Sequence, residues 1–262
     1  MRPTGAGYVS EHYIEFVGVS KAFDDNLVLD NVSFHVDHGQ TAVIMGRSGV
    51  GKSVSLKHIM GFLKPDSGRV IVAGQDITDF TEDQMVDIRR RVTMVFQSGA
   101  LFDSLTVGEN IAFPMQDREG ITQEMIDARV PELADMLEVS HDLDRLPSEL
   151  GTGMKRNVAI ARALAQDPEA ILYDEPTTMV DPLMAGHTSE LILKLKETLH
   201  KTSIVVTHDT HLARKLADTV IFLQDSRVSF FGPWKDFEAS PDQFLRSFRL
   251  LDDLIPELDV TA

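Results

Sequence analysis

The sequence predicts an α/β fold with a mixed or largely parallel core sheet, and two observations carry this prediction. Short apolar runs typical of buried strands alternate with segments of helical periodicity over most of the chain. Because parallel strands need long crossover connections, usually helices, this alternation favours a parallel sheet. The alternation stops once, from residue 98 to about residue 166, where strand signals fade and helical spacing dominates. We therefore expect a helical subdomain inserted between two core strands.

The elements of the first part follow from apolar runs and turn signals. Thr81 and Gln84 have the spacing of a capping box, which predicts a helix that starts there and continues through Arg90. We expect strands at residues 14–19, 32–36, 41–45, 69–74 and 92–96, and helices at residues 54–60 and 81–90.

The second part shows the same alternation. Leu191, Ile192, Leu195 and Leu199 share one face of an expected helix at about 182–200. A further helix should end near Ala217. We expect strands at residues 170–173, 203–207, 219–223 and 227–231, of which the last two form a hairpin. The main domain should therefore span residues 12–240, followed by a C-terminal helix and acidic tail at 241–262.

The composition limits the class of protein. With 262 residues, of which 43% are hydrophobic and 25% charged, the chain has a soluble globular balance and room for one domain with an insertion. No apolar run approaches the roughly 18 residues of a membrane span, and the first ten residues do not form a secretory signal. The absence of Cys excludes disulfides, thiolate metal sites and a Cys nucleophile, and it suits the cytosol.

The chain is strongly acidic, with a net charge of −16 and a pI near 4.9. Such a surface repels DNA, RNA and anionic lipid, so we expect no nucleic-acid partner and no direct membrane insertion. If the protein works at a membrane, a protein partner should hold it there. The simplest reason for the acidity is solubility.

Residues 46–53 match the complete Walker A motif G-x-x-x-x-G-K-S, placed between an expected strand and an expected helix. Its glycines let the backbone turn tightly so that N–H groups converge, and the helix N-terminus adds partial positive charge. Lys52 can reach the outer phosphates of a nucleotide, and the Ser53 hydroxyl can hold Mg²⁺. The expected nucleotide contacts here are Gly46, Arg47, Ser48, Gly49, Val50, Gly51, Lys52, Ser53 and Val54.

Four further side chains follow apolar strands and should reach the same carboxyl edge of the sheet. Asp174 has the Walker B arrangement, in which a carboxylate holds the Mg²⁺ shell beside Ser53. Glu175 is placed to polarise the attacking water. Gln97 can touch Mg²⁺ or water, and His208 can touch the γ-phosphate. Each of these four residues could instead have a purely structural role at the end of its strand. The presence of the Walker A loop favours a role in nucleotide binding or catalysis.

In this order the motifs resemble those of an ATP-binding cassette, the ATPase domain of ABC transporters, over roughly residues 12–240. The resemblance implies a P-loop NTPase core, an antiparallel β subdomain, an inserted helical subdomain, and ATP and Mg²⁺ as cofactors. It also implies a homodimer in which each ATP is sandwiched between one Walker A loop and the partner's signature motif. Phe23 matches the aromatic loop that stacks on adenine, Gln97 the Q-loop, Asp181 the D-loop and His208 the switch histidine.

The signature motif departs from the family pattern. Where the family has Leu-Ser-Gly-Gly followed by Gln or a similar residue, this chain has Leu150, Gly151, Thr152, Gly153 and Met154. The resemblance implies that the missing Ser hydroxyl would donate to the γ-phosphate, and a hydrogen bond to a charged group is worth roughly 1.5–3 kcal/mol. Backbone N–H groups and the helix dipole remain, and Thr152 can offer a displaced hydroxyl. We expect slower hydrolysis or weaker ATP-driven dimerisation, but not a dead enzyme.

Residues 97–107 resemble the corresponding region of the Mla and Mce lipid-transport ATPases, and residues 111–114, 51–57 and 154–156 fit them as well. This narrower resemblance implies a cytoplasmic ATPase that is peripheral on the inner face of the inner membrane. Its partners would be a membrane permease and a lipid-binding substrate protein, and its cargo phospholipid or another hydrophobic molecule crossing a bacterial envelope. Leu101 and Phe102 are candidate apolar contacts with the permease, and ordinary packing explains them equally well.

Other functions stay open. A non-transport cassette of translation or DNA repair would typically carry two fused cassettes or basic tracts, so one cassette and net acidity disfavour it. A regulatory module that binds ATP with weak hydrolysis is favoured only by the altered signature, while Glu175 and His208 argue against it. A metal site built on His208 and His211 lacks a nearby third ligand.

Overall fold

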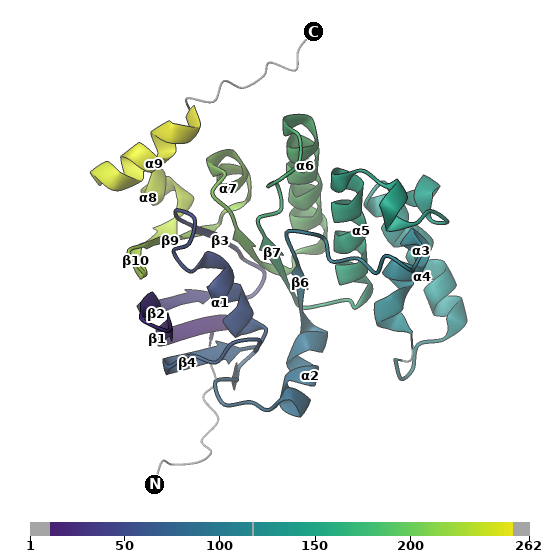
Figure 1. Ribbon diagram of the computed structural model, residues 1–262, viewed down its shortest axis with the longest axis horizontal. Coiled ribbons are helices and arrows are strands. Elements are labelled where there is room, and N and C mark those ends of the chain that lie inside the picture. The colour runs from purple at the N-terminus through teal and green to yellow at the C-terminus, as the bar shows by residue number, and fades with distance from the viewer. Residues whose placement is uncertain (1–10, 117, 254–262) are drawn as a thin grey trace.

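The computed structural model describes residues 11–116 and 118–253, and two sheets form its centre (Figure 1). The larger sheet has the strand order β10-β9-β3-β8-β7-β6. Its neighbours from β9 to β6 pair in parallel, and the edge strand β10 pairs antiparallel with β9. The α/β class with a largely parallel core sheet is therefore confirmed. The strands are β3 (Thr41–Met45), β6 (Val92–Val95), β7 (Ala170–Asp174), β8 (Thr202–Val206), β9 (Thr219–Gln224) and β10 (Arg227–Pro233).

The smaller sheet is antiparallel, with the order β2-β1-β4-β5. Its strands β1 and β2 run well beyond the expected ranges 14–19 and 32–36 and meet in a tight turn at Asp24 and Asp25. In the outer part of this hairpin, residues 20–23 and 26–27 are half-buried or exposed. The apolar run there is only three residues long, Leu27 to Leu29, so the strand signal in the sequence is short. The strands are β1 (Ile14–Phe23), β2 (Asn26–Val36), β4 (Ser67–Val72) and β5 (Gln75–Asp76).

Helices connect the strands and cover the larger sheet. The predicted capping box of α2 is confirmed, because the backbone N–H of Thr81 donates to Gln84 Oε1 (2.9 Å) and that of Gln84 donates to Thr81 Oγ1 (3.4 Å). The helices are α1 (Lys52–Ile59), α2 (Glu82–Arg91), α3 (Val107–Ala112), α4 (Gln123–Met136), α5 (Thr152–Ala165), α6 (Pro182–Leu199), α7 (Thr210–Leu216), α8 (Trp234–Ala239) and α9 (Gln243–Asp253).

The alternation of side chains along β3 divides the core into two clusters. Val43 and Met45 point to a cluster shared with α5, α6 and α7. Ala42 and Ile44 point to the opposite cluster, shared with α1, α2 and the smaller sheet. Because every residue of β3 is buried, the loop that follows it starts from a rigid position at the carboxyl edge.

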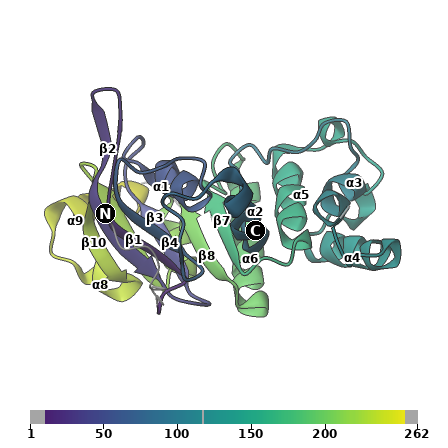
Figure 2. The same cartoon turned by 90° about the horizontal axis from the view of Figure 1, so that it is seen from below.

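Helices α3, α4 and α5 gather at the end of the molecule away from the smaller sheet (Figure 2). They fall within residues 98–166, where the helical insertion is expected, and α5 is buried along most of its length. The domain limits 12–240 and 241–262 stay predictions, and residues 254–262 of the acidic tail lie outside the described residues. Within the described part of the chain, no helix combines the length and apolar character needed to cross a membrane.

Candidate nucleotide-binding site

The phosphate loop leaves the end of β3 in a conformation that requires glycine. Gly46 has φ 147°, and a Cβ built there would lie 2.4 Å from the carbonyl oxygen of Leu223. Gly51 has φ 101°, and a Cβ there would lie 2.6 Å from Cδ2 of Leu29. Both positions combine left-handed backbone with close approach of a neighbouring strand, so the motif glycines are needed for the shape of the loop itself.

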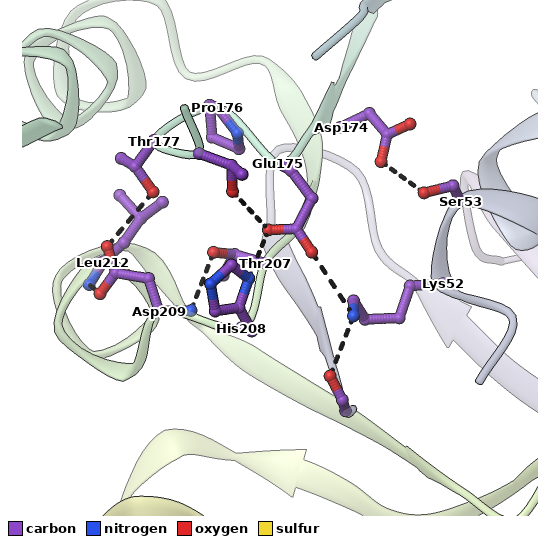
Figure 3. Close-up of polar contacts among 12 residues, drawn as sticks. Lys52, Ser53, Asp174, Glu175, Pro176, Thr177, Thr207, His208, Asp209 and Leu212 are labelled. Carbon is purple, nitrogen blue, oxygen red and sulfur yellow. Dashed lines mark hydrogen bonds and ion pairs between the residues drawn. The ribbon is translucent and has the colours of Figure 1, made fainter. Parts of the chain in front are cut away.

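Lys52 is the first residue of α1, two residues earlier than the expected helix start. Its ammonium donates to the carbonyl oxygens of Gly46 (2.9 Å) and Arg47 (3.1 Å), and the side chain is buried. The same nitrogen lies 3.4 Å from Oε1 of Glu175 (Figure 3). The lysine is thus held across the loop, at the place where outer phosphates of a nucleotide would bind.

Ser53 and Asp174 are brought together by the parallel pairing of β3, β8 and β7. The Ser53 hydroxyl donates to Oδ1 of Asp174 at 2.7 Å (Figure 3). Burial raises the pKa of Asp174, and repulsion by Glu175 adds to this, while the Ser53 hydrogen bond opposes it. A hydroxyl and a carboxylate are hard oxygen ligands, which is the donor set that Mg²⁺ prefers.

Glu175 lies at the centre of the polar contacts. It adopts left-handed backbone (φ 49°), and its N–H donates to the carbonyl of Val206 at 2.9 Å, which anchors it to the end of β8. Its Oε2 accepts from Nδ1 of His208 (2.9 Å) and from Oγ1 of Thr178 (3.1 Å). Burial by itself raises the pKa of Glu175, but the His208 hydrogen bond and the charges of His208 and Lys52 outweigh it and hold the pKa below its usual value. Glu175 is therefore an ionised carboxylate at neutral pH.

Gln97 follows β6, and its backbone is held by a residue that the sequence did not single out for a role. The guanidinium of Arg156 in α5, 2% exposed, donates to the carbonyl oxygens of Gln97 (2.6 Å), Thr178 (3.1 Å) and Pro176. Arg156 thus joins the signature helix to Gln97 and to the segment after Glu175. One sequence signal could have pointed to Arg156, because it stands among apolar positions of an expected helix. A buried guanidinium needs polar partners.

The signature and D-loop residues are adjacent to one another. Gly151 is exposed and caps α5 with an ordinary φ of −67°. A Cβ on Gly153 would lie 2.3 Å from Cε of Met184, whose N–H donates to Oδ1 of Asp181 at 3.0 Å. In the part of the chain that the structure describes, no hydrogen bond or ion pair joins residues 150–154 to residues 46–53. The structure therefore does not bring the signature to the phosphate loop of its own chain.

The remaining nucleotide and signature candidates are half-buried or exposed. Phe23 ends β1 with a partly exposed ring, and Nζ of Lys21 lies 5.6 Å from its centroid. Arg47 is exposed, and its guanidinium carbon lies 5.0 Å from the ring centroid of Phe244 in α9. This contact between phosphate loop and C-terminal helix had no signal in the sequence. Ser48, Gly49 and Thr152 are exposed, while Val50, Val54 and Met154 are half-buried.

This fold, with a phosphate loop and strand-end carboxylates at one sheet edge, defines a P-loop nucleotide-binding ATPase. A family model described as ABC transporter matches residues 29–178. The chain belongs to the ABC transporter family, as its ATP-binding, ATP-hydrolysing subunit.

Curated relatives cover most of the chain. The intermembrane phospholipid transport system ATP-binding protein MlaF of Haemophilus influenzae is 35% identical over 242 residues, covering 91% of this chain and 92% of that protein. A probable ribonucleotide transport ATP-binding protein, mkl of Mycobacterium leprae, is 32% identical over 90% of this chain and 68% of its own length.

Solved structures share the architecture. The ATP-binding cassette MJ0796, in a dimeric post-hydrolysis state bound to ADP and Pi, has a TM-score of 0.76 and 33% identity over 84% of this chain and 98% of its own. CbiO1 of Clostridium perfringens, part of an ABC transporter complex, has a TM-score of 0.80 and 25% identity over 93% of this chain and all of its own. The antiparallel sheet and the α/β core of the cassette fold are thus both confirmed.

Proposed function

We propose that this ATPase drives a membrane permease that moves phospholipid or another hydrophobic molecule across a bacterial envelope. The observation that carries the hydrolytic part is the position of Glu175, ionised and in contact with both Lys52 and His208. The lipid part is supported by the similarity to phospholipid transport ATP-binding proteins at 32–35% identity. The similarity to a ribonucleotide transport protein makes nucleotide export or import the second candidate.

The residues at the carboxyl edge suit distinct steps of hydrolysis. Ser53 and Asp174, together with Gln97 after the neighbouring strand β6, would hold Mg²⁺, which when bound neutralises charge on the phosphates. Glu175 would accept a proton from the attacking water, because its lowered pKa keeps it ionised. His208 holds the Glu175 carboxylate through Nδ1 and would contact the γ-phosphate.

A second copy of the chain would complete the site. Because the signature residues 150–154 do not contact their own phosphate loop, they are available to a partner's ATP. Apolar side chains beside Asp181 support such a contact, since Met179 is 79% exposed and Leu183 68% exposed. Exposed large apolar residues next to a catalytic edge are typical of an interface. A related cassette, MJ0796, has been solved as a dimer.

The permease would dock in a groove between the Q-loop and the helical segment. A cavity of about 330 Å³ is lined by residues of α2, β6, the segment after Gln97 and α5. Phe102 is 42% exposed, lines this cavity and lies 4.4 Å from Phe113 between ring centroids, whereas Leu101 packs against the core. Phe102 rather than Leu101 is thus the permease contact that the geometry supports. Docking there would place the protein on the inner face of the inner membrane.

Reconstitution tests the cargo. The chain is co-purified with its membrane partners and placed in liposomes of defined phospholipid composition. A phospholipid transporter should release or accept labelled phospholipid in an ATP-dependent manner, and the Glu175→Gln complex should not. ATP-dependent movement of labelled ribonucleotide without lipid movement would instead establish the second candidate.

The altered signature favours a further possibility, a regulatory cassette with weak hydrolysis. Steady-state ATPase of the wild type against Glu175→Gln separates this possibility from transport. A wild-type rate no higher than that of the variant would favour regulation.

A further inference from the structure

Helices α7, α8 and α9 lie next to one another (Figure 1) and enclose a cavity that belongs neither to the nucleotide site nor to the docking groove. Its volume is about 240 Å³. This is below the range of roughly 300–1,000 Å³ typical of drug-sized ligands, so the cavity suits a small molecule. The lining residues are Thr210, His211, Arg214, Trp234, Glu238, Arg246 and Arg249.

The cavity concentrates positive charge in an acidic protein. Three Arg and one His face a single acid, although the whole chain has 25 Lys and Arg against 41 Asp and Glu. Glu238 pairs with Arg214, and Arg249 donates to the carbonyl oxygens of Phe237 and Ser240. Within residues 11–116 and 118–253, the guanidinium of Arg246 has no acidic partner. The cavity therefore contains a guanidinium, that of Arg246, without an acidic partner among the described residues.

A second observation also indicates a missing acceptor. The indole Nε1–H of Trp234, another lining residue, is buried and has no hydrogen-bond partner in the described part of the chain. A buried donor without an acceptor costs free energy, and indole can only donate. Planar guanidinium groups bind phosphate oxygens through paired hydrogen bonds, which favours an oxyanion over chloride.

Only a few residues of the chain separate the cavity from the catalytic edge of the sheet on one side and from a phosphate-loop contact on the other. Thr210 and His211 directly follow His208 and Asp209, and Asp209 accepts from the N–H of Leu212 (2.9 Å) to cap α7. On the other side, α9 carries Arg246 two residues after Phe244, whose ring stacks against Arg47 of the phosphate loop. A ligand that draws α7 and α9 together therefore acts on both His208 and the phosphate loop.

We propose that the cavity between α7, α8 and α9 is a binding site for a small phosphate-bearing anion, either free phosphate or a phosphomonoester, that adjusts ATP hydrolysis. Arg246 and His211 bind the anion directly. Arg249 fixes the geometry of the site from α9.

The fluorescence of Trp234 tests this directly, because it is the single Trp of the chain. The full-length protein carrying Lys52→Ala, which removes the phosphate-loop ammonium, is titrated with inorganic phosphate and separately with glycerol 3-phosphate. Sodium chloride at equal ionic strength is the reference. We expect a saturable change in Trp234 emission with at least one of the two phosphate compounds and none with chloride.

Two variants test whether the change in Trp234 emission comes from binding in this cavity. Arg246→Gln in the same background should weaken binding about tenfold or more, since it removes charged hydrogen bonds to the anion. Arg90→Gln is the matched control, because Arg90 is an exposed Arg of α2 outside the cavity lining. Saturation with inorganic phosphate identifies a free-phosphate site, and saturation with glycerol 3-phosphate alone identifies a phosphomonoester site. An unchanged spectrum, or equal binding by Arg246→Gln, would overturn the proposal.

The coupling has its own readout. With Lys52 intact, the bound anion should change the kcat for ATP in the wild type but not in Arg246→Gln, whose activity without the anion should equal that of the wild type. If the anion binds but kcat does not change, the binding site is supported, and the proposed effect of the anion on ATP hydrolysis is refuted.

Discussion

The hydroxyl of Ser53 donates to Oδ1 of Asp174 over 2.7 Å, although the two residues lie 121 positions apart. The contact holds a carboxylate in a partly buried place where burial and the neighbouring Glu175 raise its pKa. An acid whose pKa is raised in the folded state binds its proton more tightly than in the unfolded chain. Ionisation of Asp174 therefore lowers the stability of the folded protein.

Asp174→Asn should consequently raise the thermal stability of the free protein at pH 8, because it removes a charge while keeping an oxygen that accepts from Ser53. The gain should shrink as the pH falls, and vanish below the ordinary Asp pKa of 3.8, where Asp174 is protonated in both states. A gain of about 1 kcal/mol corresponds to a Tm increase of roughly 2–4 °C. Melting curves of both proteins across this pH range measure the difference, and a gain that grows toward acid would contradict the assignment.

Glu175→Gln should lower steady-state ATPase by about 10²–10⁴-fold, because the amide cannot accept the proton of the attacking water. Nucleotide affinity should change only a few fold, since Lys52 keeps its contacts with Gly46 and Arg47. Phosphate release and nucleotide binding are measured on the same preparation. Glu124→Gln, an exposed residue of α4, is the control and should hydrolyse ATP like the wild type.

Gly151→Ser should increase turnover or ATP-driven dimerisation by about tenfold or more, the value of a hydrogen bond to a charged group. The structure accommodates the change, since φ is −67° and a Cβ at Gly151 meets nothing within 4 Å. Gly151→Ala adds the Cβ without the hydroxyl and serves as the control. Equal rates and equal dimer affinities for the Ser and Ala variants would rule out a role of the missing hydroxyl.

Arg156→Lys should destabilise the fold by about 2–4 kcal/mol, because an ammonium cannot serve the carbonyl oxygens of Gln97, Pro176 and Thr178 together and leaves buried acceptors unpaired. Urea denaturation measures the loss. Lys155→Met changes the neighbouring helix position and should have a much smaller effect. A loss below about 0.5 kcal/mol for Arg156→Lys would show that these carbonyl oxygens find other partners.

Phe102→Asp should detach the protein from its permease while sparing ATP binding, because it removes an exposed apolar ring that packs against Phe113 and puts a carboxylate at the proposed contact. Co-purification from membranes measures attachment. Met125→Asp, also an exposed apolar residue of the helical segment but outside the groove lining, should remain attached. Normal co-purification of Phe102→Asp would refute docking at this groove.

The sequence alone predicted those elements and motifs of this protein that depend on local interactions. The strand, loop and helix around residues 41–60, the capping box at Thr81 and the strand that ends at Asp174 depend on neighbours within a few residues. Parallel pairing then places strand ends at one edge, so the contact between Ser53 and Asp174 follows from motif and fold class together.

The tertiary structure decided what depends on residues distant in sequence. The clamp of Arg156 on Gln97, the contact of Arg47 with Phe244 and the cavity of α7, α8 and α9 each join segments separated by tens to hundreds of residues. A local sequence pattern does not predict which distant carbonyl group or aromatic ring a side chain will contact. The outer β1–β2 hairpin was missed because its apolar run is only three residues long, Leu27 to Leu29, while the backbone pairing between the two strands extends further.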